Sequence, residues 1–405
     1  MTEALRFYTE DVMPLDLAAI QQALRAQGLD AWLLYDFHGS NPIAARLTGV
    51  ANGPHLATRR WYYLIPAQGE PRGLVHAIER HNLDQLPGRK VVYVGREQLE
   101  AGLTDLLKGV TRIAMEYSPR CAIPYMSRLD AGTAEAIRAR GVEILSSGDL
   151  VQQFEAAWSD AELTSHRAAS EALYRIKDRA FEAASKALRS GQSLTEYGLQ
   201  QEMVGWFEEE GLISDSAPVV ALGGNAGNPH YLPGAGESKT IVADEVLLLD
   251  LWGKQRSPGA VFADITWVGV TASRVPDEAA RAFRAAADAR DTAVTMVNDA
   301  ARQGRDLRGW EVDRAAREVL ERAGYRDRIL HRTGHSLGEN VHGNGVHLDD
   351  YETHDDRRFL PGTAFTVEPG LYFDTFGVRT EINVFRAERE AVVTGPRQAE
   401  IVTLV

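Results

Sequence analysis

Hydrophobic and polar positions alternate between helical and extended spacings over roughly the first 150 residues. Residues 15–27 carry apolar side chains three to four positions apart, which predicts an amphipathic helix that ends at Gly28. Further helical patterns lie at 96–108 and 126–140, and short apolar runs that predict strands lie at 31–35, 61–65, 73–77, 91–95 and 112–116. This alternation is typical of a small α/β domain, which we expect over residues 1–155.

A different pattern begins after residue 155. Ser159 and Glu162 have the spacing of a capping box, which predicts the start of a long helix at 160–189. Three more helices are expected at 194–210, 276–303 and 308–323, and strands at 217–222, 245–251, 261–270, 364–368 and 379–386. We therefore expect a separate α+β domain over residues 156–405, large enough to bury its own core.

The segment 245–270 predicts a β-hairpin that carries two aspartates. Asp250 and Asp264 lie at equal distances from Ser257, the centre of a glycine- and proline-containing turn. In a symmetric hairpin they would stand opposite each other or nearly so, with Cβ atoms about 4.5–5.5 Å apart.

The segment 364–386 repeats the arrangement with two glutamates. Glu368 and Glu381 lie evenly about a turn centred between Asp374 and Thr375. Like charges that face each other destabilise a sheet, and burial makes an uncompensated carboxylate costlier. Either pair alone could be two solvated acids, but two such hairpins in one domain favour a bound metal ion.

Histidines gather near these hairpins in the sequence. Five of the eleven lie within 331–354, in a glycine-rich stretch: His331, His335, His342, His347 and His354. His230 lies in another glycine- and proline-rich stretch upstream of Asp250. Glycines allow the backbone to approach a ligand closely, so these stretches are candidate binding loops.

A second motif in the same stretch points to different chemistry. Residues 334–338 read GHSLG, which matches the nucleophile elbow of α/β-hydrolases with Ser336 as nucleophile. That elbow requires a helix after the serine, and the following residues are poor helix formers. The last histidine, His354, also follows Ser336 too closely for the usual order of a triad. The sequence therefore disfavours a serine hydrolase.

Composition and charge exclude several classes of protein. The 405 residues are 44% hydrophobic and 25% charged, which excludes a disordered chain. A formal net charge of −13 repels phosphate backbones, so we expect no nucleic acid partner. No apolar run approaches the roughly 20 residues of a membrane span, so we expect no membrane partner. Residues 1–4 do not begin a signal peptide and Cys121 stands alone, so we expect a cytoplasmic protein.

The motifs LLLDLWG, ADITW, TGHSLG, FTVEPGLY and GVRTE, in this order, resemble a known family of metallopeptidases. The family contains methionine aminopeptidases, prolidases and Xaa-Pro aminopeptidases, which share the pita-bread fold. The preceding domain resembles the N-terminal domain of prolidases, Xaa-Pro aminopeptidases and creatinase. The resemblance implies an α+β pita-bread catalytic domain over 156–405, after a smaller creatinase-like α/β domain over 1–155.

The resemblance also implies a set of five metal ligands, which are Asp250, Asp264, His335, Glu368 and Glu381. In this family the first aspartate chelates one ion, and the histidine and the first glutamate bind the other. The second aspartate and the last glutamate bridge the two ions. Glu368 is in addition expected to take a proton from the attacking water and pass it to the departing nitrogen.

Three further residues match family positions near the substrate. His342 corresponds to a histidine that contacts the substrate at the scissile bond, and His230 to an upstream histidine that touches the substrate. Arg379 corresponds to an arginine beside the bridging glutamate. With Glu368, these three are the expected catalytic residues.

The chain departs from the family pattern in three places. The turn between Asp250 and Asp264 is longer by about three residues, so we expect the hairpin to include a bulge. Gly343, Asn344 and Gly345 follow His342 where many relatives carry a glutamate and a proline. Phe262 stands where relatives often have a tyrosine. The last two departures concern residues outside the metal ligands.

These features together predict an enzyme that cleaves the bond before proline. Four carboxylates balance two divalent ions, and oxygen-rich ligation favours Mn²⁺, with Co²⁺ or Zn²⁺ as alternatives. We expect an Xaa-Pro dipeptidase (a prolidase) that acts on small peptides with proline in second position, as a homodimer. An Xaa-Pro aminopeptidase for longer peptides is the closest alternative. A creatinase-like C–N hydrolase and a non-catalytic pita-bread binding protein are more distant ones, because both predict loss of the carboxylates.

Overall fold

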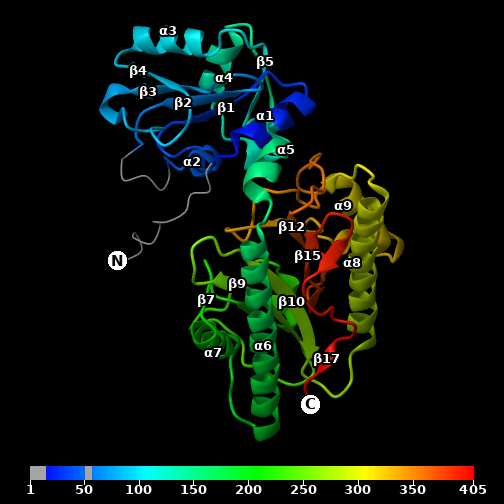
Figure 1. The fold of residues 1–405 in the computed structure, drawn as a ribbon. Helices are drawn as coiled ribbons and strands as arrows, with labels where there is room; N and C mark the ends of the chain where they lie inside the picture. The colour runs from blue at the N-terminus through cyan, green and yellow to red at the C-terminus, as the bar shows by residue number, and fades with distance from the viewer. Residues whose placement is uncertain (1–14, 51–56) are drawn as a thin grey trace. The chain divides into compact units, whose positions relative to one another are not determined.

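The computed structural model describes residues 15–50 and 57–405 and separates into two units, one that ends at Glu155 and one that spans Ala156–Val405 (Figure 1). Within these described ranges no helix is both long and apolar enough to cross a membrane. The prediction that residues 1–4 begin no signal peptide falls outside the described residues.

A mixed sheet of six strands, in the order β4-β3-β2-β1-β5-β6, forms the centre of the first unit. The strand β2 is antiparallel to both of its neighbours, and the other neighbouring pairs are parallel. The strands are β1 (Ala31–Asp36), β2 (Trp61–Pro66), β3 (Arg72–His76), β4 (Arg89–Tyr93), β5 (Arg112–Met115) and β6 (Glu143–Ser146). The helices are α1 (Leu17–Ala26), α2 (Pro42–Thr48), α3 (Arg96–Leu106), α4 (Ala131–Arg138) and α5 (Gly148–Val151).

The apolar run of β1 is continuous because the sheet is covered on both faces. Trp32 and Leu34 belong to the hydrophobic cluster that includes Ile20 of α1. Leu33 belongs to the cluster on the other face, which includes Leu103 of α3. A strand in a sheet that is covered on both faces lacks the alternation of apolar and polar residues that an exposed face would produce.

Two short elements of this unit differ from the prediction for local reasons. The helix predicted at 126–140 begins at Ala131, because the side chain of Asp130 caps it by accepting from the N–H of Thr133 at 2.8 Å. The sequence pattern did not predict the helix α2, because this helix is short. Asn41 caps it and Pro42 occupies its first position.

The second unit contains long helices around several small sheets. One sheet has the order β17-β10-β9-β7, with β8 also paired to β9; another has the order β11-β12-β15-β16; and β13 pairs with β14. The helices are α6 (Asp160–Ser190), α7 (Glu196–Glu209), α8 (Asp277–Gln303) and α9 (Gly309–Arg322). The strands are β7 (Leu212–Ile213), β8 (Val219–Leu222), β9 (Val246–Gln255), β10 (Ala263–Val270), β11 (Ser336–Leu337), β12 (Ala364–Val367), β13 (Gly370–Tyr372), β14 (Gly377–Arg379), β15 (Ile382–Arg386), β16 (Ala391–Val393) and β17 (Val402–Thr403).

The predicted capping box starts the helix α6. Ser159 and Glu162 exchange side-chain and backbone hydrogen bonds at its first turn, as the sequence indicates. Figure 1 shows this long helix running beside β9 and β10, with α8 on the opposite side of the unit.

The two faces of β9 enter different hydrophobic clusters, and this decides where its aspartate lies. Leu247 and Leu249 pack in the cluster that contains residues of α6 and α7. Val246 and Leu248 pack in the cluster that contains residues of α8 and α9. Side chains alternate along a strand, so Asp250 points to the second face and is buried there, 8% exposed.

Candidate metal centre

The first hairpin brings Asp250 and Asp264 to one face of the sheet, offset by two positions. Asp250 pairs with Thr266 and Asp264 pairs with Trp252, so the turn is centred on Pro258 and not on Ser257. The pairing continues without interruption from Val246–Val270 to Gly253–Ala263. The expected bulge is therefore wrong, because the additional residues lie in the connection between the strands.

The second hairpin has the predicted register. Val367 pairs with Ile382 on one side of the two glutamates, and Gly370 pairs with Arg379 on the other. Both pairs centre the turn between Asp374 and Thr375. Glu368 and Glu381 consequently occupy facing positions.

His335 is held so that one ring nitrogen faces the carboxylates. Its Nδ1 lies 3.1 Å from the carbonyl oxygen of Ser336, and since a carbonyl can only accept, Nδ1 carries the hydrogen. Its Nε2 lies 3.5 Å from Asp264 Oδ2 and 3.5 Å from Glu368 Oε1. Burial lowers the pKa of His335, which favours the neutral ring with a free lone pair on Nε2.

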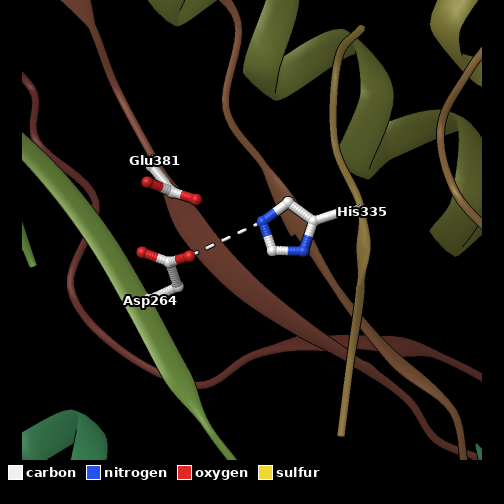
Figure 2. A group of neighbouring side chains, drawn as sticks. All are labelled: Asp264, His335 and Glu381. Atoms are coloured by element: carbon white, nitrogen blue, oxygen red, sulfur yellow. Dashed lines mark ion pairs between the residues drawn. The ribbon is translucent and has the colours of Figure 1, made fainter. Parts of the chain in front are cut away.

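Asp264, His335 and Glu381 form a cluster whose ligand atoms lie within 4.8 Å of one another (Figure 2). Asp264 Oδ1 and Glu381 Oε1 are buried and have no hydrogen-bond partner in the part of the chain that the structure describes. Burial raises the pKa of Asp264 well above its usual range, and the carboxylate of Asp250 raises it further. Burial and Asp264 raise the pKa of Glu381 in the same way. Two orphaned oxygens beside an imidazole lone pair fit a divalent cation, which would stabilise both carboxylates in their charged form.

Asp250 and Glu368 lie beside this cluster and are held by Arg379. A buried ion pair joins Arg379 Nη2 to Asp250 Oδ2, and Arg379 Nε lies 3.9 Å from Glu368 Oε2. Burial alone would lower the pKa of Arg379, but Asp250 and other neighbours raise it well above its ordinary value. The arginine is therefore a permanent positive charge at the edge of the centre.

Two residues that the sequence did not single out connect these groups. The hydroxyl of Thr266 lies 2.7 Å from Glu381 Oε2 and 3.2 Å from Asp250 Oδ1, and it accepts a hydrogen bond from Arg379 Nε at 2.8 Å. Arg379 Nη1 also donates to the hydroxyl of Tyr372 at 3.2 Å. The sequence could have indicated Thr266, because it lies two residues after Asp264 and therefore on the same face of the strand.

His342 and His230 lie nearer the surface. The ring of His342 packs edge-on against His335, with centroids 4.3 Å apart at 84°. The neighbouring His335 and burial lower the pKa of His342 to about 3, so the ring is neutral at physiological pH. His230 is exposed, and its backbone N–H donates to Asn228 Oδ1 at 3.0 Å.

The structure offers no nucleophile elbow at Ser336. The residue lies on the short strand β11, is 1% exposed, and its Oγ accepts a hydrogen bond from the N–H of Gly345 at 2.9 Å. A Cβ at Gly345 would lie 2.6 Å from this Oγ, and a Cβ at Gly343 would lie 2.9 Å from it. Close approach to Ser336 thus explains the two glycines that depart from the family pattern.

Phe262, the other departure, packs in a hydrophobic cluster. Its side chain is 4% exposed and belongs to a small hydrophobic cluster with Trp158, Val261, Leu337 and Ala364. Its carbonyl oxygen accepts from His166 Nδ1 at 2.8 Å. The role of Phe262 is therefore structural support of the hairpin.

The fold and the buried group of carboxylates and histidine define a class of metal-dependent hydrolases. The chain belongs to metallopeptidase family M24, whose model matches residues 168–388. This confirms the resemblance inferred from the motifs.

Comparisons with individual proteins agree with this assignment. The chain is 29% identical over 214 residues to an Xaa-Pro dipeptidase of Lactobacillus helveticus, which is 50% of this chain and 51% of that protein. It is 28% identical over 243 residues to an Xaa-Pro dipeptidase of Lactobacillus delbrueckii subsp. lactis, 58% of each chain. The chain thus spans about half the length of the curated relatives that it matches.

The solved structures extend the likeness over both units. Dipeptidase PepE from Mycobacterium ulcerans superposes with a TM-score of 0.70 at 21% identity, over 98% of this chain and 100% of that one. An Xaa-Pro dipeptidase from Bacillus anthracis superposes with a TM-score of 0.60 at 20% identity, over 96% and 98%. These matches confirm the predicted fold class, a pita-bread domain preceded by a smaller α/β domain.

Proposed function

We propose that the chain is a metal-dependent Xaa-Pro dipeptidase, with the N-terminal domain over 1–155 and the catalytic domain over 156–405. The observation that carries the proposal is the pair of orphaned carboxylate oxygens on Asp264 and Glu381 beside His335 Nε2. Such a group is costly unless cations occupy it, and the family is one of metallopeptidases. The names of the relatives supply the substrate, a dipeptide with proline in second position.

Five side chains would hold two divalent ions: Asp250, Asp264, His335, Glu368 and Glu381. By the family resemblance Asp264 and Glu381 would be shared between the ions, and both lie with His335 in one cluster. Four carboxylates and a neutral imidazole balance two +2 charges, and this oxygen-rich set favours Mn²⁺ over Co²⁺ or Zn²⁺. When bound, the ions supply an acidified water and polarise the scissile carbonyl.

The protein's own groups then handle the protons and the substrate. Glu368 takes a proton from the attacking water on a carboxylate oxygen and delivers it to the proline nitrogen, which must be protonated to depart. His342 is neutral and can donate a hydrogen bond to the oxygen that develops negative charge, with His230 beside it. Arg379 orients Asp250 through their ion pair.

An Xaa-Pro aminopeptidase for longer peptides is the second candidate. A putative Xaa-Pro aminopeptidase of Mycoplasma pneumoniae is 24% identical over 181 residues, which supports it. Creatinase-like hydrolysis and a binding role without catalysis both predict loss of the carboxylates, and all four are present. A homodimer and a cytoplasmic location are further parts of the proposal, the latter because the single Cys121 fits a reducing compartment.

Metal reconstitution combined with a choice of substrates tests the proposal. Protein stripped of metal should hydrolyse neither Ala-Pro nor Ala-Pro-Ala, and Mn²⁺ should restore cleavage of Ala-Pro with two ions bound per chain. Preferential cleavage of Ala-Pro-Ala would favour the aminopeptidase. Mass spectrometry after exhaustive chelation shows whether the ions have been removed from the protein. Full activity in demonstrably metal-free protein would exclude the metal mechanism.

A further inference from the structure

Trp252 stands directly opposite Asp264 in the first hairpin. The two residues are paired in the ladder between β9 and β10, so their side chains project from the same face with Cβ atoms about 4.5–5.5 Å apart. Trp252 also follows Asp250 by two residues and shares its face. A large aromatic side chain is therefore adjacent to two of the proposed metal ligands.

The indole is held in place from two sides. Its Nε1 donates to Asp215 Oδ1 at 2.7 Å. Asp215 lies in the connection between β7 and β8, two strands that both pair with β9, so its backbone is anchored to the same sheet. Trp252 also packs against the small hydrophobic cluster around Phe262, as does Val341, the neighbour of His342. The ring is partly buried, and the remainder is open to solvent.

The charges around Trp252 indicate which end of a substrate lies there. An Xaa-Pro dipeptide carries an ammonium group on Xaa and a carboxylate on proline. The carboxylate of Asp215 is exposed and accepts from the indole N–H, whereas the charge of Asp264, opposite the ring, would be balanced by the bound ions. The carboxylate of Asp215 attracts the ammonium and repels the proline carboxylate. The Xaa residue is thus directed towards Trp252.

From this arrangement we infer that Trp252, held by Asp215, walls the subsite for the N-terminal residue and makes the enzyme selective for small Xaa side chains. The inference rests on the proposed function and adds the substrate class to it. A large Xaa side chain would have to displace the indole and break its hydrogen bond to Asp215. A difference of one or two carbons in such a pocket changes kcat/KM by about 10–200-fold.

The test compares Ala-Pro with Phe-Pro as substrates of the metal-loaded enzyme. The wild type should prefer Ala-Pro by at least about ten-fold in kcat/KM. Trp252→Ala should reduce that preference at least about ten-fold, chiefly by lowering KM for Phe-Pro, and Trp252→Phe should give an intermediate ratio. Trp206, which contacts Arg179 on α6, is the matched control: Trp206→Ala should leave the ratio unchanged.

Two variants of Asp215 separate its charge from its hydrogen bond. Asp215→Asn keeps an oxygen for the indole N–H but removes the charge, so it should raise KM for both dipeptides and preserve their ratio. Asp215→Ala removes both and should also relax the ratio. Metal content and melting temperature, measured on every variant, show that the folded metal centre is retained.

The outcomes of these measurements distinguish a failure of the inference from a failure of the proposed function. A ratio that stays within two-fold of wild type in Trp252→Ala, with two metal ions bound, would overturn the inference while leaving the dipeptidase proposal intact. A wild type that prefers Phe-Pro would overturn it as well. A metal-loaded wild type that cleaves no Xaa-Pro peptide would refute the proposed function, and the inference would fall with it.

Discussion

Arg379 and Asp250 form a buried ion pair between the two hairpins of the metal centre, with side chains 7% and 12% exposed. The pair joins a residue of β14 to one of β9, which are far apart in the sequence. It places one fixed positive charge among four carboxylates. The centre is thereby partly neutralised before any cation binds.

Replacing Arg379 should therefore destabilise the metal-free protein. Arg379→Ala leaves Asp250 as an unpaired buried charge, a change that costs about 3–5 kcal/mol in comparable pairs. The free energy of unfolding, measured by urea denaturation after chelation, should fall by this order, and Mn²⁺ should restore part of it. Arg397→Ala is the control, because Arg397 and Asp291 form an exposed ion pair, with side chains 41% and 48% exposed. This substitution should change the free energy of unfolding by less than about 1 kcal/mol. Equal effects of the two substitutions would contradict the role given to Arg379.

The ligands that we propose to be shared should matter more to metal content than those proposed to bind one ion. Glu381→Ala removes a ligand from both proposed ions and should bind at most one ion tightly, with hydrolysis reduced by orders of magnitude. Asp250→Asn should keep the ion held by His335 and Glu368. Mass spectrometry of the purified proteins gives the stoichiometry. Two tightly bound ions in Glu381→Ala would show that this glutamate is not shared.

His342 should affect the reaction and not the metal. His342→Ala should lower kcat by about 10²–10³-fold, as expected for loss of a hydrogen bond to developing negative charge, with metal content nearly unchanged. Ser336→Ala is the comparison, because its hydroxyl accepts from the backbone N–H of Gly345, and it should retain most activity. Covalent labelling of Ser336 by a serine-directed phosphonate, or an inactive Ser336→Ala enzyme with full metal content, would instead indicate a serine nucleophile.

Acid should destabilise the second unit through His166. Burial lowers the pKa of this histidine to about 4, and its ring contacts the carbonyl of Phe262 and the hydroxyl of Thr394. The unfolded chain binds the proton at its ordinary pKa near 6.5, so stability is full above that value and is lost as pH falls towards 4. The lowered pKa corresponds to a loss of about 3 kcal/mol at most in the free energy of unfolding.

The measurement is the free energy of unfolding of metal-free protein between pH 7 and pH 4. His166→Asn should flatten this dependence, since it removes the titrating ring. His38→Asn is the control, because His38 is exposed and has a positive φ of 59° that asparagine tolerates. An unchanged slope in His166→Asn would mean that other groups cause the acid sensitivity.

The sequence by itself determined the elements and the chemistry that each carries. Strand and helix periodicity are local, so α6 with its capping box and the two acid-bearing hairpins could be predicted. The register of Glu368 and Glu381 was also correct, because a single turn sets it. The register of Asp250 and Asp264 was wrong by two positions, since the longer connection could be centred on either of two neighbouring residues.

Only the tertiary structure decided which side chains meet. The Thr266 hydroxyl reaches Glu381 across 115 residues of sequence, and Trp252 reaches Asp215 across 37. Neither contact follows from periodicity, because it depends on how separate sheets pack and on the path of a loop. Burial is decided at the same level: whether a carboxylate is solvated or forced beside another depends on the helices that cover its strand. For that reason the sequence predicted acids in facing strands, while the orphaned oxygens, the Arg379–Asp250 pair and the tryptophan beside Asp264 required the folded chain.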